Sequence, residues 1–214
     1  MPNAVPATVW LYRMVHIANL PDVLERGMFS CRHPEFRPPV VRMGDVSLAE
    51  ARDHYRLSTP AEGAIGEHVA FYFAGHSPML LKIKNGTGIP QHHQRDVVYI
   101  VVRFQRLLDL GLPYVVTDGH AKNSITRTFV TPEGLEQVDW EAVGAREWNN
   151  TEGDRDRMRR KQAECLVRGQ VPREAIEALG VFDADREREV SDLVARAGLA
   201  IKVKVDGQRK LYYP

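Results

Sequence analysis

The apolar segment VVYIVVRF, at residues 97–104, is the clearest indication of the fold in this sequence. A short apolar run that is rich in β-branched and aromatic residues is typical of a strand buried on both faces. Residues 8–16 (TVWLYRMVH) contain the same residue types, and residues 67–74 (EHVAFYFA) alternate apolar side chains with a period of two. Both patterns predict further strands, and together the three segments predict a sheet around which the rest of the chain is arranged.

Capping and helix-forming residues predict four helices, and shorter apolar runs predict three more strands. We expect helices at residues 20–26, 47–55, 103–110 and 184–197 and strands at residues 79–84, 114–117 and 200–205. Residues 154–168 are expected to form a helix or a helix that runs into a strand, whereas residues 28–47 and 121–153 are expected to be irregular. Without repeats or a linker, this mixture favours a single α+β domain over residues 1–214.

The composition is that of an ordinary globular protein. Of the 214 residues, 43% are hydrophobic and 27% are charged, and 29 Lys and Arg against 28 Asp and Glu give a formal charge of +1. This balance excludes a polycation or an acidic tail. No apolar run approaches the roughly 20 residues that span a bilayer, and the N-terminus lacks a signal-peptide pattern, so we expect a soluble protein of the cytoplasm.

Familiar catalytic and metal-binding signatures are absent from the sequence. It contains no GxGxxG, GxxxxGK[ST], HExxH or GxSxG motif, which argues against nucleotide-fold, P-loop, zincin and hydrolase classes. Cys31 and Cys165 are isolated, so neither a disulfide framework nor a zinc site is predicted. His92 and His93 have no carboxylate or Cys at ligand spacing, which favours a solvated pair over a metal site.

Positive charge is concentrated locally in the second half of the chain. Residues 155–173 carry seven basic side chains against two acidic ones, a net charge of +5. Such a cluster suits contact with a phosphate backbone, although a charge run is more often a solvated helix face. Glu164 lies in this segment within an apolar frame, and a carboxylate in such surroundings needs a partner.

Five residues that would each be ordinary in isolation occur in one order along the chain. They are His16 in YRMVHIANL, Arg52 in SLAEAR, Tyr72 in FYFAGHSPML, His120 in YVVTDGHA and Glu164 in RRKQAECLV. Together these segments resemble the DarT family, the DNA ADP-ribosyltransferase toxins of bacterial toxin–antitoxin pairs. The resemblance extends over nearly the whole chain, and it rests on the combination rather than on any single motif.

The resemblance implies the ADP-ribosyltransferase (PARP-like) fold, in which a split central β-sheet holds NAD in a cleft. NAD is then the co-substrate, and no metal is needed. His16 and its neighbours Ile17, Ala18 and Asn19 would hold the nicotinamide side of NAD. Tyr72 would stack on the nicotinamide ring, and Ser77 and Met79 would line the same wall.

The resemblance also implies roles for three residues at the reaction centre. Glu164 would be the catalytic glutamate, because cleavage of the nicotinamide–ribose bond builds positive charge that a carboxylate stabilises. The family equivalent of Arg52 is assigned a proton-accepting role toward the target base. An arginine pKa lies above about 12, so Arg52 is equally suited to bind the NAD phosphates or the deprotonated base, with His120 as the proton acceptor.

The implied acceptor is a base, with thymine favoured, in single-stranded DNA, because a paired base cannot present its ring nitrogen. A macrodomain antitoxin is the implied partner, and residues 120–154 would form the recognition loop. Trp148 or Tyr114 would stack on bases, and the phosphate contacts would come from Arg146, Arg155, Arg157 and Arg159. The alternatives are the same chemistry on guanine, RNA or protein, and a non-catalytic nucleic-acid-binding module that uses the basic cluster.

Overall fold

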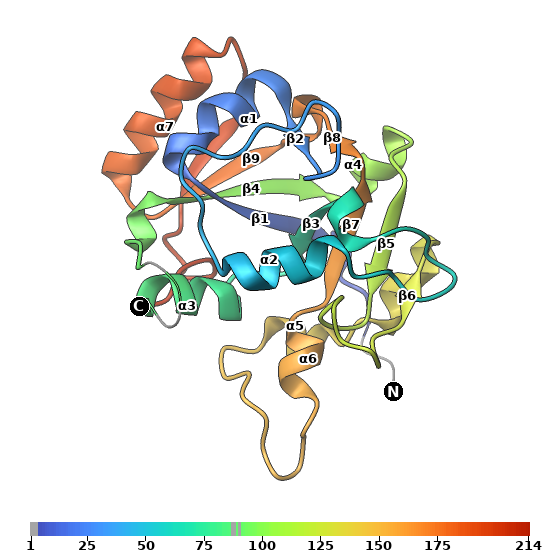
Figure 1. Cartoon of the computed structure of the whole chain (residues 1–214). Coiled ribbons are helices and arrows are strands. Elements are labelled where there is room, and N and C mark those ends of the chain that lie inside the picture. The colour runs from blue at the N-terminus through green and yellow to red at the C-terminus, as the bar shows by residue number, and fades with distance from the viewer. Residues whose placement is uncertain (1–3, 87–88, 90) are drawn as a thin grey trace.

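The computed structural model describes residues 4–86, 89 and 91–214, and within them the chain forms a mixed sheet of eight strands and a separate pair of strands (Figure 1). The strands are β1 Trp10–His16, β2 Met28–Phe29, β3 His68–Tyr72, β4 Val97–Arg103, β5 Tyr114–Thr117, β6 Thr128–Phe129, β7 Glu164–Arg168, β8 Gln170–Val171, β9 Ala178–Val181 and β10 Lys202–Val205. The large sheet has the order β10-β9-β4-β1-β3-β7-β5-β6, and β2 pairs with β8. In the large sheet only β9 and β10 are parallel neighbours.

Strand β4 confirms the prediction of a strand that is buried on both faces. Val98 and Ile100 lie in the larger hydrophobic core, whereas Val97 and Tyr99 lie in a second core on the opposite side. All four side chains are fully buried. Burial of one such side chain stabilises the fold by about 1.5–3 kcal/mol, so this strand anchors helices and loops on both faces of the sheet.

The sheet is divided between β1 and β3. Strand β1 pairs with β4 along seven residue pairs, but its ladder with β3 contains the single pair Tyr12–Tyr72. Strand β3 pairs along its length with β7 instead, which places Tyr72 opposite Glu164. Arg13 bridges the division with a 2.9 Å hydrogen bond from its Nη1 to the carbonyl oxygen of Ala70. The two halves therefore diverge beyond one point of contact, as a split sheet requires.

Seven helices surround the sheet in the described part of the chain. They are α1 Leu20–Arg26, α2 Val46–Asp53, α3 Pro78–Asn85, α4 Phe104–Asp109, α5 Trp140–Gly144, α6 Arg157–Lys161 and α7 Ala184–Arg196. Figure 1 shows α1 and α7 together at one end of the molecule and α5 and α6 together at the other, with α2 and α3 between them. None of these helices is long and apolar enough to cross a membrane.

One sequence prediction is wrong in kind: residues 79–84 form helix α3 and not a strand. The Ser77 hydroxyl accepts a hydrogen bond from the backbone N–H of Leu80, Pro78 occupies the first turn, and Gly86 ends the helix in the left-handed conformation. Leu80 and Ile83 are both fully buried, at the spacing of three that one helical face requires. The apolar run was short enough to suit either structure, and the cap decides between them.

Other predictions are confirmed or need extension. Residues 154–168 do run from a helix, α6, into a strand, β7, whereas β8 and β9 were not predicted. Residues 121–153 contain β6 and α5, and residues 28–47 contain β2, so neither stretch is wholly irregular. In β9, Gly180 obscures the strand pattern. A Cβ there would lie 2.4 Å from the Leu211 side chain, so the glycine makes room for the C-terminal segment.

The C-terminal segment lies across the sheet and fastens the start of α3. The hydroxyl of Tyr212 has a single hydrogen to donate and lies between two carbonyl oxygens, those of Val97 at 2.7 Å and Gly180 at 3.0 Å. The hydroxyl of Tyr213 donates to the carbonyl oxygen of His76 at 2.7 Å. This anchoring holds the residues before α3 in place beside the division of the sheet.

Candidate active site

A cleft of about 630 Å³ opens where β1 and β3 diverge, and we refer to it as the main cleft. Side chains of β1, β3 and α2 line it, together with residues of the segment between β2 and α2. Clefts of about 300–1,000 Å³ are typical of small-molecule and cofactor sites. The lining includes Glu164 and His120, which come from the other half of the split sheet and from the loop after β5.

Three ionisable side chains meet in the main cleft. The Nη2 atom of Arg52 lies 3.0 Å from Oε2 of Glu164, and its Nη1 atom lies 3.2 Å from Nε2 of His120. The Glu164 side chain is 2% exposed and that of Arg52 is 16% exposed. The structure therefore brings together the three residues, separated by up to 112 positions, that the sequence analysis assigned to the reaction centre.

Each of the three side chains is held by its own element. Arg52 lies in the last turn of α2, which Asp45 caps by accepting a hydrogen bond from the Leu48 N–H. Glu164 begins β7, and its backbone N–H donates to the hydroxyl oxygen of Thr117 at 2.9 Å. The carboxylate of Glu164 also accepts a 3.3 Å hydrogen bond from the backbone N–H of Ala121.

Burial and neighbouring charges set the protonation of this cluster. Burial lowers the pKa of Arg52, but the adjacent Glu164 carboxylate more than offsets this, and the pKa is raised above its ordinary value. Burial lowers the pKa of His120; the Glu164 carboxylate opposes this, the Arg52 guanidinium adds to it, and the pKa ends below its ordinary value. Burial and Glu164 raise the pKa of Tyr72 to about 12. Near pH 7 the guanidinium is charged, the imidazole is neutral and the phenol keeps its proton.

The contact between Arg52 and His120 fixes the histidine tautomer. A charged guanidinium can only donate, so Nε2 of His120 accepts the hydrogen bond and the ring proton resides on Nδ1. The Arg52 side chain has no lone pair with which to take a proton from a substrate. Of the two candidates for proton acceptor, the neutral imidazole of His120 is the chemically competent one.

Most residues assigned to the NAD site line the main cleft. His16, Ala18, Asn19, Arg52, Tyr72 and Met79 belong to its lining. Ile17 instead packs against the larger core. Ser77 is 3% exposed and caps α3, and it lies outside the lining.

Asn19 has a second function in shaping the cleft. Its side-chain amide donates to the carbonyl oxygen of Val41 at 2.7 Å and accepts from the Val41 N–H at 3.0 Å. These paired bonds secure the segment between β2 and α2 along the cleft.

Arg13 was missed in the sequence analysis although it carries charge into the main cleft. It lies in the middle of β1, lines the cleft, and burial lowers its pKa. The signal was present in TVWLYRMVH, since a cation within an apolar strand needs a partner. The cleft lining contains further cations, Arg26, Arg37, Arg42 and Lys82. Arg26 and Arg37 are paired with Asp22 of the same lining, and the excess of cations over carboxylates in the lining suits a ligand that carries phosphates.

A second hollow, of about 650 Å³, adjoins the main cleft at His120. Its lining contains Trp148, Arg155 and Arg159 among the residues predicted to contact DNA. Two exposed apolar side chains, Ile125 (65% exposed) and Met158 (40% exposed), also line it. Apolar and aromatic surface beside a cation is the combination on which unstacked bases bind.

The remaining predicted DNA contacts lie outside this lining. Arg146 is exposed and donates to the carbonyl oxygen of Arg209 at 3.5 Å. Arg157 lies 3.6 Å from the carboxylate of Asp154. Tyr114 packs edge-on against Phe104, with ring centroids 4.8 Å apart, at the margin of the larger core. The ring of Tyr114 thus packs against the core.

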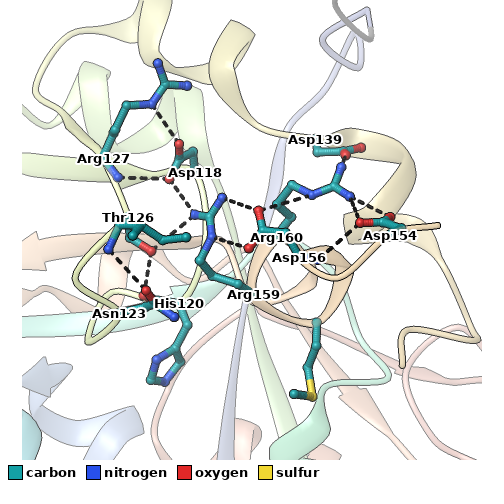
Figure 2. A network of polar contacts seen from close by, with 12 residues as sticks. Asp118, His120, Asn123, Thr126, Arg127, Asp139, Asp154, Asp156, Arg159 and Arg160 are labelled. Atoms are coloured by element: carbon teal, nitrogen blue, oxygen red, sulfur yellow. Dashed lines mark hydrogen bonds and ion pairs between the residues drawn. The ribbon is translucent and has the colours of Figure 1, made fainter. Parts of the chain in front are cut away.

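The positive cluster at residues 155–173 is largely neutralised within the fold (Figure 2). Arg159 is bonded to Asp118 and Asp156, and Arg160 to Asp139 and Asp154. The Arg159 side chain is only 11% exposed. The expectation that Arg159 contacts a DNA phosphate does not fit these surroundings, because its guanidinium is already occupied by two carboxylates.

Lys161 is also withdrawn from the cluster's surface. It is 5% exposed, and its ammonium donates to the carbonyl oxygens of Val143 and Ala145. Burial lowers its pKa to about 8. Arg155 is the member of the α6 region that remains exposed beside the second hollow.

The paired histidines diverge rather than sharing a ligand. His92 packs edge-on against His16 at 5.6 Å between ring centroids, while His93 caps a short helical turn by accepting from the Arg95 N–H. His92 is therefore partly buried instead of solvated, and His93 is exposed. In the described ranges, no three His, Cys, Asp or Glu side chains are grouped so as to hold a metal ion.

Residues 12–213 match the family model described as DarT, ssDNA thymidine ADP-ribosyltransferase. A DNA ADP-ribosyl transferase of Thermus sp. (strain 2.9) is 30% identical over 213 residues, with 100% of both chains covered. The structure of Thermus sp. 2.9 DarT in complex with ADP-ribosylated ssDNA is similar with a TM-score of 0.90 and 28% identity, covering 100% of both chains. The structure of Thermus sp. 2.9 DarT in complex with NAD+ gives a TM-score of 0.84 and 27% identity, covering 98% of this chain and 100% of that one.

Proposed function

Because the chain belongs to the DarT family of ssDNA thymidine ADP-ribosyltransferases, we propose that it transfers ADP-ribose from NAD to thymine in single-stranded DNA and releases nicotinamide, with Arg52, His120 and Glu164 as its catalytic residues. The fold is the ADP-ribosyltransferase fold. The observation that carries the proposal is the contact of these three side chains where the main cleft meets the second hollow. The matched residues run through both sheets, which supports a single catalytic domain.

The main cleft is suited to NAD by its size and by its charge. Its volume of about 630 Å³ and its cations, which include Arg13 and Lys82, fit a dinucleotide with two phosphates. Tyr72 would lie against the nicotinamide ring, and His16, Ala18, Asn19 and Met79 would surround that end of the ligand. Bound NAD supplies the ADP-ribosyl group and nicotinamide as leaving group. Ile17 and Ser77 would act indirectly, by packing and by capping α3.

Glu164 would stabilise the positive charge that develops on the ribose. Its carboxylate is held by hydrogen bonds from Arg52 and Ala121, so it is oriented before the reaction begins. A fixed charge in a water-poor site stabilises a transition state more than the same charge in water does. The guanidinium of Arg52 both orients Glu164 and donates to His120. It would therefore connect the residue that acts on the ribose with the residue that acts on the base.

His120 would accept the proton that the ring nitrogen of the base loses as it attacks the ribose. The proton goes to Nε2, the nitrogen that carries no hydrogen, and Nε2 gives up the hydrogen bond that it accepts from Arg52 as the base takes its place. The imidazole of His120 is neutral near pH 7 because burial lowers its pKa. It lies in the lining of both the main cleft and the second hollow, so it can reach a base that enters from the hollow. Arg52 would stabilise the negative charge on the base, in place of the proton-accepting role that the family resemblance implied.

The second hollow would hold the nucleotides on either side of the modified base. Trp148, Met158 and Ile125 offer apolar surface for bases, and Arg155 offers a charge for a phosphate. Arg157 and Arg146 would contribute from outside the hollow. Arg157 meets its protein partners at 3.4 and 3.6 Å, contacts long enough to be exchanged for a phosphate.

The decisive experiment incubates the whole chain with NAD and two single-stranded oligonucleotides that differ only in the replacement of every thymine by cytosine. Mass spectrometry should show one added ADP-ribose unit on the thymine-containing strand alone. Glu164→Gln, which keeps the shape of the side chain, should bind the strand but lower kcat by about 10²–10³-fold. An adduct on guanine, on RNA or on the protein itself would show that this group, and not thymine in DNA, is the acceptor. Strand binding without any adduct would favour the non-catalytic module.

A macrodomain antitoxin and action in the cytoplasm complete the proposal. Both follow from the toxin–antitoxin character of the family that the chain resembles. Expression in a bacterial host should arrest growth, and Glu164→Gln should not. Co-expression of a macrodomain that removes ADP-ribose from thymine should restore growth; persistence of the arrest while the DNA is cleared of adducts would contradict a DNA target.

A further inference from the structure

His120 lies on a loop without regular structure, yet the proposed reaction needs its imidazole in one place. The loop follows β5 and turns back into β6, and Figure 2 shows how polar contacts hold it. The His120 N–H donates to the carbonyl oxygen of Arg159 at 3.0 Å. Its own carbonyl oxygen accepts from the hydroxyl of Thr126 at 2.9 Å and from the N–H of Asn123 at 2.9 Å. The backbone N–H of His120 is thus held by α6, and its carbonyl oxygen is held from within the loop.

The Arg159 side chain reaches into the same loop. Its Nη1 donates to Oδ1 of Asp118 at 2.8 Å and to the Thr126 hydroxyl at 3.2 Å. Its Nε and Nη2 donate to the carboxylate of Asp156 at 2.7 Å each. Asp118 in turn accepts from the backbone N–H and the Nε of Arg127, both at 2.9 Å.

The pair of Arg159 and Asp118 is buried and closely fitted. The exposed fractions of their side chains are 11% and 8%. A Cβ on Gly119 would lie 2.3 Å from Nη1 of Arg159, so the glycine makes room for the guanidinium beside the loop. A charged pair in such a place has been removed from water, and loss of either member leaves the other uncompensated.

We propose that Arg159 and Asp118 are positioning residues that lock the loop of residues 118–127 onto helix α6 and so hold the His120 imidazole against Arg52. The inference rests on the proposed function of His120. It also assigns the Arg159 side chain a role other than phosphate binding. Since α6 ends three residues before Glu164, the same pair sets the position of His120 relative to the glutamate.

A merely structural ion pair is the competing explanation, and the chain supplies its own comparison. Arg160 lies on the same helix and is bonded to Asp139 and Asp154, neither of which belongs to the His120 loop. Arg160 also lies 3.6 Å from the carboxylate of Asp156, so both arginines are paired with carboxylates and share one of them. Only Arg159 reaches Asp118 and Thr126.

The experiment compares Arg159→Met with Arg160→Met in the whole chain. Each is measured for kcat and KM with NAD and a thymine-containing single strand, for NAD affinity and for thermal unfolding. Arg159→Met should lower kcat by about a hundredfold, the effect of misplacing a reacting group by about 1 Å, while KM for NAD and NAD affinity stay close to those of the wild type. Arg160→Met should lower the unfolding temperature without changing kcat. Asp118→Asn keeps the shape of the pair and Arg159→Lys keeps its charge. The kcat of each should lie between that of the wild type and that of Arg159→Met.

A second measurement does not depend on catalysis. The imidazole of His120 faces Arg52 from α2, Glu164 from β7 and Lys122 from its own loop, and burial is the largest influence on its pKa. When the loop is released, water should enter and the pKa should rise toward about 6.5, which NMR titration of the histidine ring protons detects in Arg159→Met. Arg160→Met should leave the pKa of His120 unchanged.

The proposal is overturned if Arg159→Met and Arg160→Met lower kcat equally and neither moves the titration of His120. It is also overturned if Arg159→Met acts through KM for NAD. These outcomes are distinct from failure of the proposed function, because in that case the wild-type protein itself gives no adduct on thymine. A shifted titration in Arg159→Met would then still support the positioning role.

Discussion

At the scale of single residues, Arg52 is the group on which the site depends. Its planar fork donates to Glu164 through one nitrogen and to His120 through another. One residue therefore carries the charge that fixes a carboxylate and the donor that fixes a histidine tautomer. A lysine has a single ammonium at the end of its chain and cannot reproduce two divergent bonds.

We expect Arg52→Lys to fold and to bind NAD but to lose about 10²–10³-fold in kcat. The retained charge still compensates Glu164, while the bond to His120 is lost. Steady-state kinetics with a thymine-containing single strand measures the effect, and Arg168→Lys is the matched control because Arg168 pairs with Glu67 at the surface. Full activity of Arg52→Lys would exclude any role that needs the guanidinium fork.

His120 should give the reaction an acidic limb. Burial lowers its pKa, so the ring is neutral and able to accept a proton at pH values above the ordinary value of about 6.5. The value of kcat should be level from about pH 8 to about pH 6.5 and should fall only at lower pH. His120→Asn should be much slower and should lack this limb. A midpoint above the ordinary histidine value would contradict the neutral imidazole.

At the scale of elements, helix α3 forms part of the cleft because its first turn is tightly capped. Ser77 accepts from Leu80, and the hydroxyl of Tyr213 donates to the carbonyl oxygen of His76 and lies 3.2 Å from that of Ser77. Pro78 and Met79, which follow directly, line the main cleft. The cap therefore holds Pro78 and Met79 on the cleft wall, although Ser77 itself lies outside the cleft lining.

Ser77→Ala should lower the free energy of unfolding by about 1 kcal/mol, the usual contribution of a helix cap, and should leave KM for NAD unchanged. Chemical denaturation measures the first effect and steady-state kinetics the second. Ser191→Ala is the control, because Ser191 is exposed in the middle of α7 and the cap of that helix is Asp183. A rise in KM for NAD without loss of stability would instead place the Ser77 hydroxyl in direct contact with NAD.

At the scale of the whole molecule, many of the cations that are clustered in the sequence are paired inside the fold, and fewer of them are exposed at the surface. The sequence shows a net charge of +5 over residues 155–173, but Arg159, Arg160 and Lys161 are engaged inside the fold. Few cations of this cluster remain free to meet a phosphate. An enzyme of this kind should bind its strand weakly and release it readily.

Strand binding should accordingly depend only modestly on salt. Each phosphate neutralised on a single strand contributes about −0.7 to the slope of log K against log salt. Arg155→Gln should make the slope less negative by about that amount, because Arg155 is exposed beside the second hollow. Arg160→Gln should leave the slope unchanged. Equal changes for both variants would mean that the ion pairs of α6 open when DNA binds.

Some features of the fold and the site were predictable from the sequence, and others were not. Strand β4 and helix α1 follow from local patterns, and Arg52, Tyr72 and Glu164 were found through the order of short motifs. The neutralisation of Arg159 was not predictable, because Asp118 lies 41 positions away in the chain. Helix α3 was mistaken for a strand because a segment of six residues with four apolar side chains fits both periods. Long-range pairing decides the first case, whereas the local cap at Ser77 decides the second.

The register of β7 against β3 has a consequence for how this enzyme can change over time. Glu164 and Leu166 point to one side of the sheet while Cys165 and Val167 lie in the larger core on the other. Loss or gain of one codon within this strand would exchange the two sides and turn the Glu164 carboxylate into the core. Descendants of this gene should therefore vary here by substitution, and their insertions and deletions should accumulate in the loops.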